Sequence, residues 1–196
     1  VFICLSSQAT ADNIAAKVIS LRGKIVVAYP DGKTVNLKKG DDVIEHAIIK
    51  SSKASFAKLL FIDKSTMNIG PSSSVEIAMF VKNKPGLIKL MGGEIRSKVT
   101  KNYMDIKSQN RSKLLIKTPT AAMGVRGTDF IVSVENNKSS FKVLEGTIVV
   151  IPLKNLATQI SIDDKLINNL DKKLNSNSSV KVTANNMTTV TTNSKP

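Results

Sequence analysis

The sequence predicts an all-β protein: a β-sandwich, or a β-roll or solenoid-like stack of short strands, with one amphipathic helix near the C-terminal end. Apolar residues make up 41% of the 196 residues and aromatic residues only 4%, so the core has to be built from Ile, Val, Leu and Met, many of them β-branched. Short apolar runs recur at intervals of about 8–12 residues with turn sequences between them, which is typical of sandwiches and barrels. A helical period is found only in residues 156–175.

The first half of the chain alternates between apolar runs and turns. Pro30-Asp31-Gly32-Lys33 is a turn sequence, because proline fixes φ and glycine tolerates the corner. Arg22-Gly23 breaks the first long run, and Ser51-Ser52-Lys53 breaks a later one. The predicted strands lie within residues 16–29, 35–37, 43–49, 54–62, 66–69 and 75–81.

The second half continues the pattern. Gly92-Gly93 separates two apolar runs, residues 100–113 are polar and predict a loop, and Asn136-Asn137 predicts a hairpin turn. The small-residue stretch 120–123 is expected to cross from the strand that ends at Thr118-Pro119 to the run that begins at Gly124. The predicted strands lie within residues 87–91, 94–97, 114–117, 130–135, 140–144 and 147–151. A β domain is therefore expected over residues 16–152, with a loose recurrence of glycine-x-apolar strand starts and no internal repeat.

Residues 153–179 predict a helical insertion and linker. Ile162, Leu166, Leu170 and Leu174 recur every fourth residue, and Asp163 or Asp164 can cap the helix start; these six residues lie within 156–175. The helix is expected to lie against the sheet, with a partner-binding helix as the alternative. Residues 180–192 then predict a terminal hairpin that completes the β domain.

The N-terminal residues resemble the end of a secretory signal peptide. An apolar run, Val1 to Leu5, is followed by Ala9-Thr10-Ala11, which has the small-residue pattern of a cleavage site. Residues 1–11 are therefore expected to be removed, and the protein to be periplasmic or secreted in a bacterium. The sole cysteine, Cys4, would be removed with them. The alternative is a buried N-terminal strand. No later stretch has 18 uninterrupted apolar residues, so no transmembrane segment is predicted.

The chain is strongly basic, with a formal net charge of +14. The lysines are spread along the sequence rather than grouped, which favours a solubilising role. An anionic envelope polymer is the first alternative and nucleic acid the second. Aromatic residues interleaved with basic ones, as in nucleic-acid platforms, are absent from the sequence, so no nucleic-acid partner is expected.

No catalytic pattern is evident in the sequence. The one histidine, His46, has no nucleophile motif around it and predicts a surface or satisfied residue. The acidic pairs Asp41-Asp42 and Asp163-Asp164 suit a turn and a helix cap better than a metal site. We therefore expect no enzyme activity, no metal and no cofactor.

The stretch from residue 116 to 132 carries the strongest motif. Gly124 and Gly127 flank Arg126, one of four arginines in a chain with 25 lysines. A guanidinium offers five fixed donors, so it can tie carbonyls or a carboxylate in one geometry. One interpretation is a corner anchored by Arg126 that locks two strands, with a carboxylate partner among Asp129, Glu94 and Glu145. The other is an exposed anion or ligand site.

These residues resemble the signature of the FecR domain family. The resemblance is carried by Thr118-Pro119-Thr120-Ala121, by the run from Gly124 to Phe130, and by the run from Val143 to Val150. Upstream, Gly23-Lys24-Ile25 and the run from Leu37 to Asp41 are also similar to the family, so that the resemblance covers residues 17–151. The candidate structural or binding residues are Thr118, Pro119, Gly124, Arg126, Gly127, Thr128, Asp129, Glu145 and Gly146.

The resemblance implies a non-enzymatic envelope protein acting as a protein-binding, sensory or scaffold module. An envelope protein partner is expected at strand edges or beside the corner, and an anionic cell-wall or surface glycan is the alternative ligand. There are departures: Lys64 stands where the family usually has a turn glycine, and the sequence shows neither the anti-sigma segment nor the membrane helix of well-known FecR regulators. Iron-citrate signalling and sigma-factor control are therefore not carried over.

Overall fold

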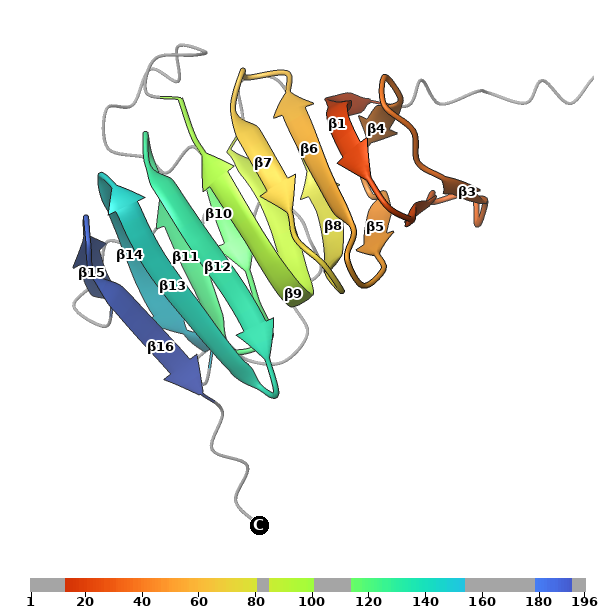
Figure 1. The fold of residues 1–196 in the computed structure, drawn as a ribbon. Coiled ribbons are helices and arrows are strands. Elements are labelled where there is room, and N and C mark those ends of the chain that lie inside the picture. Colours follow the sequence, from red (N-terminus) through yellow and green to blue (C-terminus); the bar gives the residue numbers. More distant parts are fainter. Residues whose placement is uncertain (1–12, 81–84, 101–113, 154–178, 192–196) are drawn as a thin grey trace, which may run out of the picture.

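The computed structural model describes residues 13–80, 85–100, 114–153 and 179–191, and these form an all-β protein of two packed layers (Figure 1). The first layer has the strand order β4 (Asp42–Ile44), β1 (Ile14–Arg22), β6 (Phe56–Phe61), β7 (Thr66–Ile69), β9 (Gly86–Lys98), β12 (Asp129–Glu135), β13 (Lys138–Glu145) and β16 (Met187–Thr191). The second layer has the order β3 (Thr34–Asn36), β2 (Ile25–Ala28), β5 (Ile48–Ser51), β8 (Ser74–Met79), β9 again, β10 (Leu114–Lys117), β11 (Ala121–Val125), β14 (Thr147–Pro152) and β15 (Val180–Thr183).

Strand β9 belongs to both layers and joins them into one continuous sheet. Its residues 86–92 pair with β8 and β10, and its residues 93–98 pair with β7 and β12. The pairing between β9 and β10 is parallel, and every other pairing among the described strands is antiparallel. The sequence predicted two strands separated by Gly92-Gly93, but the chain instead bends at these glycines and continues as one strand.

Three glycines with positive φ lie at three of the places where the chain passes between the layers. Gly23 joins β1 to β2, Gly93 lies at the bend of β9, and Gly146 joins β13 to β14, with φ of 79°, 83° and 87°. Each is followed two residues later by a buried isoleucine. The recurring glycine-x-apolar pattern of the sequence is therefore a repeated corner between layers.

A hydroxyl side chain fills the space beside each of these corners. The Ser55 Oγ accepts the backbone N–H of Lys24 at 3.0 Å, and the Ser73 Oγ accepts that of Glu94 at 2.9 Å. At the third corner, the Thr128 Oγ1 donates to the carbonyl oxygen of Thr147 at 3.0 Å. A Cβ on Gly93 would lie 2.3 Å from the Ser73 Oγ, so a larger residue could not be accommodated there without movement.

The core lies between the layers and is mainly aliphatic. Alternate residues of most strands point inward, as in β6, β7 and β12, which agrees with the predicted period of two. Phe61 and Phe80 pack with ring centroids 4.5 Å apart. The largest fully buried side chains are Phe130, Phe141, Ile25, Ile49, Leu59, Met67, Ile69, Ile77, Leu87, Ile88, Leu90 and Ile95. The all-β prediction is confirmed.

Several predictions concern residues outside the described ranges, namely the leader 1–11, the helix within 156–175 and all but the first residue of the loop 100–113. The predicted hairpin at 180–192 is wrong in its pairing: β15 pairs with β14 in the second layer, and β16 pairs with β13 in the first. The turn at Asn185 is held on β13 instead, because Asn185 N–H donates to the carbonyl oxygen of Val143 at 2.9 Å. Within the described ranges, no helix has the length and apolar character needed to span a membrane.

Candidate functional site

The motif predicted from the sequence forms a corner between β11 in the second layer and β12 in the first. Gly127 has a φ of 60° and is buried, so the turn uses a conformation that other residues adopt at a cost. Thr128 is 1% exposed, and its Oγ1 lies 3.2 Å from the carbonyl oxygen of Arg126 and 3.0 Å from that of Thr147. The hydroxyl therefore fastens this corner to the neighbouring corner at Gly146.

Arg126 does not anchor the corner, and that interpretation is wrong. Its side chain is exposed and makes no hydrogen bond or ion pair with the described part of the chain. The arginine that holds the corner is Arg96 on β9, whose Nε and Nη2 donate to the two carboxylate oxygens of Asp129 at 3.0 and 2.9 Å. The corner is thus tied by an arginine, as expected, but by Arg96, which lies 33 residues before Asp129 in the chain.

The ion pair lies at the boundary between protein and solvent. The Asp129 side chain is 10% exposed and the Arg96 side chain 51%. The hydrogen bonds from Arg96 lower the pKa of Asp129; burial opposes this shift, and the positive charges of Arg96 and Lys98 add to it. The same hydrogen bonds and charge raise the pKa of Arg96. Asp129 is therefore held as a carboxylate.

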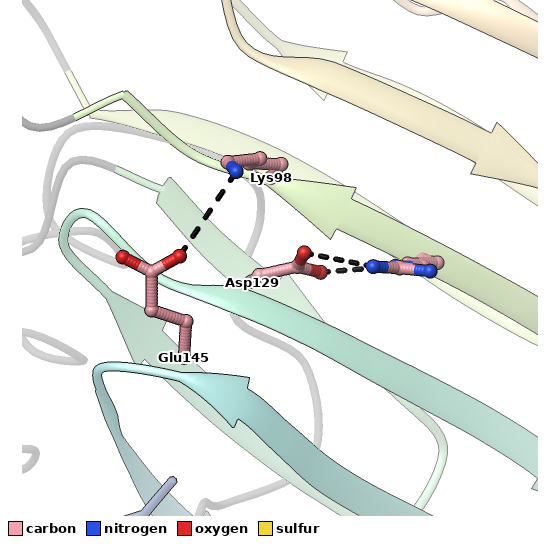
Figure 2. A network of polar contacts seen from close by, with 4 residues as sticks. Lys98, Asp129 and Glu145 are labelled. Carbon is pink, nitrogen blue, oxygen red and sulfur yellow. Dashed lines mark hydrogen bonds and ion pairs between the residues drawn. The ribbon is translucent and has the colours of Figure 1, made fainter.

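A groove of about 460 Å³ lies beside this ion pair. Lysines and carboxylates both line it, and the Lys98 Nζ lies 4.0 Å from the Glu145 Oε2 (Figure 2). The lining residues are Lys64, Thr66, Lys98, Val99, Thr100, Gly127, Thr128, Asp129 and Glu145. The volume is in the range of small-ligand sites, but the charges of both signs suit a polar ligand or the side chains of a partner better than an apolar molecule.

Lys64 reaches the groove from an unusual backbone conformation. It lies in the turn between β6 and β7 with a φ of 65°, a region that favours glycine. The turn therefore places a lysine side chain on the groove wall.

The other predicted motif residues lie at the opposite end of β11, away from the groove. Thr118 and Thr120 are 2% and 1% exposed. They form a chain of hydroxyl bonds with Ser139 of β13: Thr120 Oγ1 donates to Ser139 Oγ at 2.6 Å, and Ser139 Oγ donates to Thr118 Oγ1 at 2.8 Å. Pro119 is exposed at the tip of this turn. The turn between β10 and β11 is thereby fixed to the first layer.

The remaining predicted residues take different positions. Gly124 is buried within β11, opposite Val149 of β14, while Glu145 and Gly146 lie at the corner that follows β13. His46 is exposed in the turn after β4 with a φ of 63°. Across the described ranges there is no group of three or more potential metal ligands.

Three groups at the site were missed by the sequence reasoning: Arg96, Lys98 and Lys64. Arg96 and Lys98 alternate with the buried Ile95 and Ser97, so their outward direction follows from the strand period. No local signal pairs Arg96 with Asp129, because that contact depends on the alignment of β9 with β12.

Each layer also ends in strands that pair on one side only among the described strands. β16 at one end has five residues, none of them charged, and its Met187 is 64% exposed. At the opposite end, β4 and β3 have three residues each, and β4 begins with Asp42. In Figure 1, β15 and β16 lie at the end of the molecule opposite to β1, β3 and β4.

Comparisons with known proteins give one family match and a shared fold. The sequence model of the family described as "FecR protein" matches residues 47–149, just over half of the chain. A crystal structure described as a "putative anti-sigma factor from Parabacteroides distasonis ATCC 8503" is 13% identical over 76% of this chain, with a TM-score of 0.53, which shows a similar fold. This chain spans only 57% of that protein.

Another structure, described as "Cell surface anchoring domain", is 24% identical over 34% of this chain and 87% of its own length, with a TM-score of 0.33. No curated protein matches the chain. The family match includes Lys64, Arg96, the corner at residues 126–128 and Glu145, so it covers the whole groove described above. The chain belongs to the FecR family.

Proposed function

We propose that this chain is a non-catalytic sensory or scaffold module of the bacterial cell envelope, periplasmic or secreted, that binds a protein partner. Membership of the FecR family supports a regulatory or sensory protein without enzyme activity. The signal-like residues 1–11 support export. Fractionation of cells that express the full gene tests the location, because a stable, uncleaved cytoplasmic product would contradict it.

The edge of β16, which has no second neighbour among the described strands, supports partner binding. An edge strand presents unpaired N–H and C=O groups, and soluble proteins usually protect such edges with charged residues, proline or very short strands. β16 is five residues long and contains Met, Thr and Val only. An extended segment of a partner could add to this edge as a further strand of the first layer.

The other edges are less suited to strand addition. β3 and β4 are three residues long, and β15 carries Lys181. The two exposed hydrophobic residues of the terminal strands, Val180 and Met187, are 50% and 64% exposed. They add apolar contact area at the same end of the molecule, where a partner strand could bury it.

A photoreactive amino acid at position 187, introduced into the chain in its native cells, tests this edge. We expect a crosslink to one extended segment of one envelope protein, and loss of that crosslink when Thr189→Lys places a charge on the edge strand. The matched control is a photoreactive residue at Thr34, which is exposed on β3. Equal crosslinking at both positions, or an unchanged crosslink in Thr189→Lys, would contradict binding at β16.

The net charge of +14 supports one alternative, an anionic cell-wall or surface glycan as the ligand. Binding of that kind weakens as salt screens exposed charges, whose interactions decay over about 10 Å at 0.1 M. A pull-down with purified cell wall at low and high salt separates the alternatives. The glycan proposal requires binding that is present at low salt and lost at high salt.

A further inference from the structure

The second layer has an apolar cluster on its outer face, the face turned away from the first layer. Leu87 shows this direction, because it alternates along β9 with Ile88, which belongs to the main core. The same alternation places Leu115 outward between Leu114 and Ile116. The outer cluster consists of Ala78, Leu87, Leu115, Ala122 and Ile151.

The cluster is continuous across neighbouring strands. Leu87 pairs with Met79 on one side and with Leu115 on the other, and Ala122 pairs with Ile151. Met79, Val149 and Leu153 pack around it as partly buried residues. One apolar surface therefore extends from β8 through β9, β10 and β11 to β14.

This surface is covered. Its five members are 0–3% exposed, although none of the described strands lies over the outer face of the second layer. A row of aliphatic side chains on the outside of a sheet becomes this inaccessible only when other chain packs on it.

We propose that residues 154–178 of the same chain cover this surface, with Ile162, Leu166, Leu170 and Leu174 packed on the outer cluster. The described chain ends on this face at Leu153, which itself contacts the cluster. The next described stretch of the chain begins beside the same strand, because Val180 of β15 pairs with Val150 of β14. Both ends of the segment are therefore fixed at the same edge of the second layer.

The length of the segment fits this position. A loop between two paired antiparallel strands needs only about 2–5 residues, whereas 25 residues (154 to 178) intervene here. The cluster crosses five strands, which at about 4.8 Å per step is a width of roughly 19 Å. The apolar positions 162–174 would form a helix of about 20 Å, since each residue rises 1.5 Å.

The other two internal segments outside the described ranges fit less well. Residues 81–84 are too few to cover five strands, and residues 101–113 are mostly polar, without a repeating apolar position. This role for residues 154–178 is independent of the edge at β16: the segment then belongs to the fold of the domain itself, and partner binding does not use its apolar face.

Disulfide trapping in the full chain tests the proposal. In a Cys4→Ser background, a cysteine replaces Val149 or Met79 at the rim of the cluster and a second one replaces Leu166, Leu170 or Leu174. We expect at least one of these pairs to form a disulfide within a single molecule. Matched pairs that use Asn168, Asn169 or Lys172 instead should not form one. If the cysteines of the apolar series crosslink two molecules instead, a second copy covers the face and the proposal is wrong.

Charge substitution provides a second measurement. Leu170→Asp should lower the Tm by more than about 5 °C, the size of shift expected for a loss of buried apolar contact in a domain of this length, and should increase the binding of a hydrophobic dye. Asn169→Asp adds the same charge one residue away and should change neither. Equal and small effects of the two substitutions, with no intramolecular disulfide in the trapping series, would overturn the proposal.

Discussion

Arg96 donates to both carboxylate oxygens of Asp129 from a diagonal position in the first layer. In the register of β9 and β12, Asp129 lies opposite Lys98, and Arg96 lies opposite Ile131. The guanidinium therefore reaches two residues along the paired strands to form the bidentate pair, at 3.0 and 2.9 Å. Because Asp129 is the first residue of β12, this pair fixes the strand where it leaves the corner.

We expect Arg96→Gln to destabilise the protein more than Arg126→Gln does. Without Arg96, a nearly buried carboxylate loses its charged donors; a charged hydrogen bond contributes about 1.5–3 kcal/mol, and the half-exposed position of Arg96 reduces this to about 1 kcal/mol. Arg126 is exposed without a partner in the described chain, so its substitution should change the free energy of unfolding by less than about 0.5 kcal/mol. Urea denaturation of both variants measures the difference. A larger loss in Arg126→Gln would restore Arg126 as the anchor.

The same ion pair makes stability depend on pH. The pKa of Asp129 is lower in the folded protein than in the unfolded chain, where an aspartate has a pKa of about 3.9. The folded state therefore binds fewer protons at this group, and its contribution is present above that value and lost as the pH falls through the folded pKa. The wild type should exceed Arg96→Gln in stability near neutral pH, with the gap closing on acidification. A gap that stays constant down to pH 2 would exclude Asp129 as its source.

Local features of the sequence were enough to predict most strands. β12 (Asp129–Glu135) and β8 (Ser74–Met79) closely match predicted ranges, because alternating burial and turn residues are properties of neighbouring positions. β11 (Ala121–Val125) was missed and described as a small-residue crossing. All five of its residues are buried, so the strand shows no alternation in the sequence, and its small residues have weak β propensity.

The site was predicted less completely than the fold. The corner and Asp129 could be identified from the glycines and their spacing, which are local. The choice between Arg96 and Arg126 could not, because both are arginines next to apolar residues and only the register of β9 against β12 decides which one faces the carboxylate. The buried hydroxyl chain at Thr118 and Thr120 likewise depends on Ser139 of another layer.

Two buried serines should respond to alanine substitution in opposite directions. Ser97 is 1% exposed between Met67 and Phe130, and its Oγ has no hydrogen-bond partner in the described structure, so Ser97→Ala should raise the free energy of unfolding by up to about 1 kcal/mol. Ser139 links Thr118 and Thr120, so Ser139→Ala should lower it by about 1–2 kcal/mol. Denaturant melts of the two variants measure both. A loss in Ser97→Ala as large as that in Ser139→Ala would mean that Ser97 has a partner.

Two glycines with the same φ of 83°, Gly93 and Gly32, separate the effect of backbone conformation from that of packing. A Cβ on Gly32 meets nothing within 4 Å. Gly32→Ala should therefore lower the free energy of unfolding only by the cost of a positive φ, about 1–2 kcal/mol. A Cβ on Gly93 would lie 2.5 Å from the Cα of Ser73, which is backbone and cannot rotate away, so overpacking should bring the loss to about 3 kcal/mol or more.

Thermal and urea unfolding of both alanine variants measure this difference, and an insoluble Gly93→Ala beside a folded Gly32→Ala would agree with it. Because Gly93 is the point where β9 passes from the second layer to the first, its variant should also lose the pairing of β9 with β7 and β12 first, seen as early hydrogen exchange at residues 95 and 97. Equal losses in the two variants would show that the layers do not meet closely at Ser73.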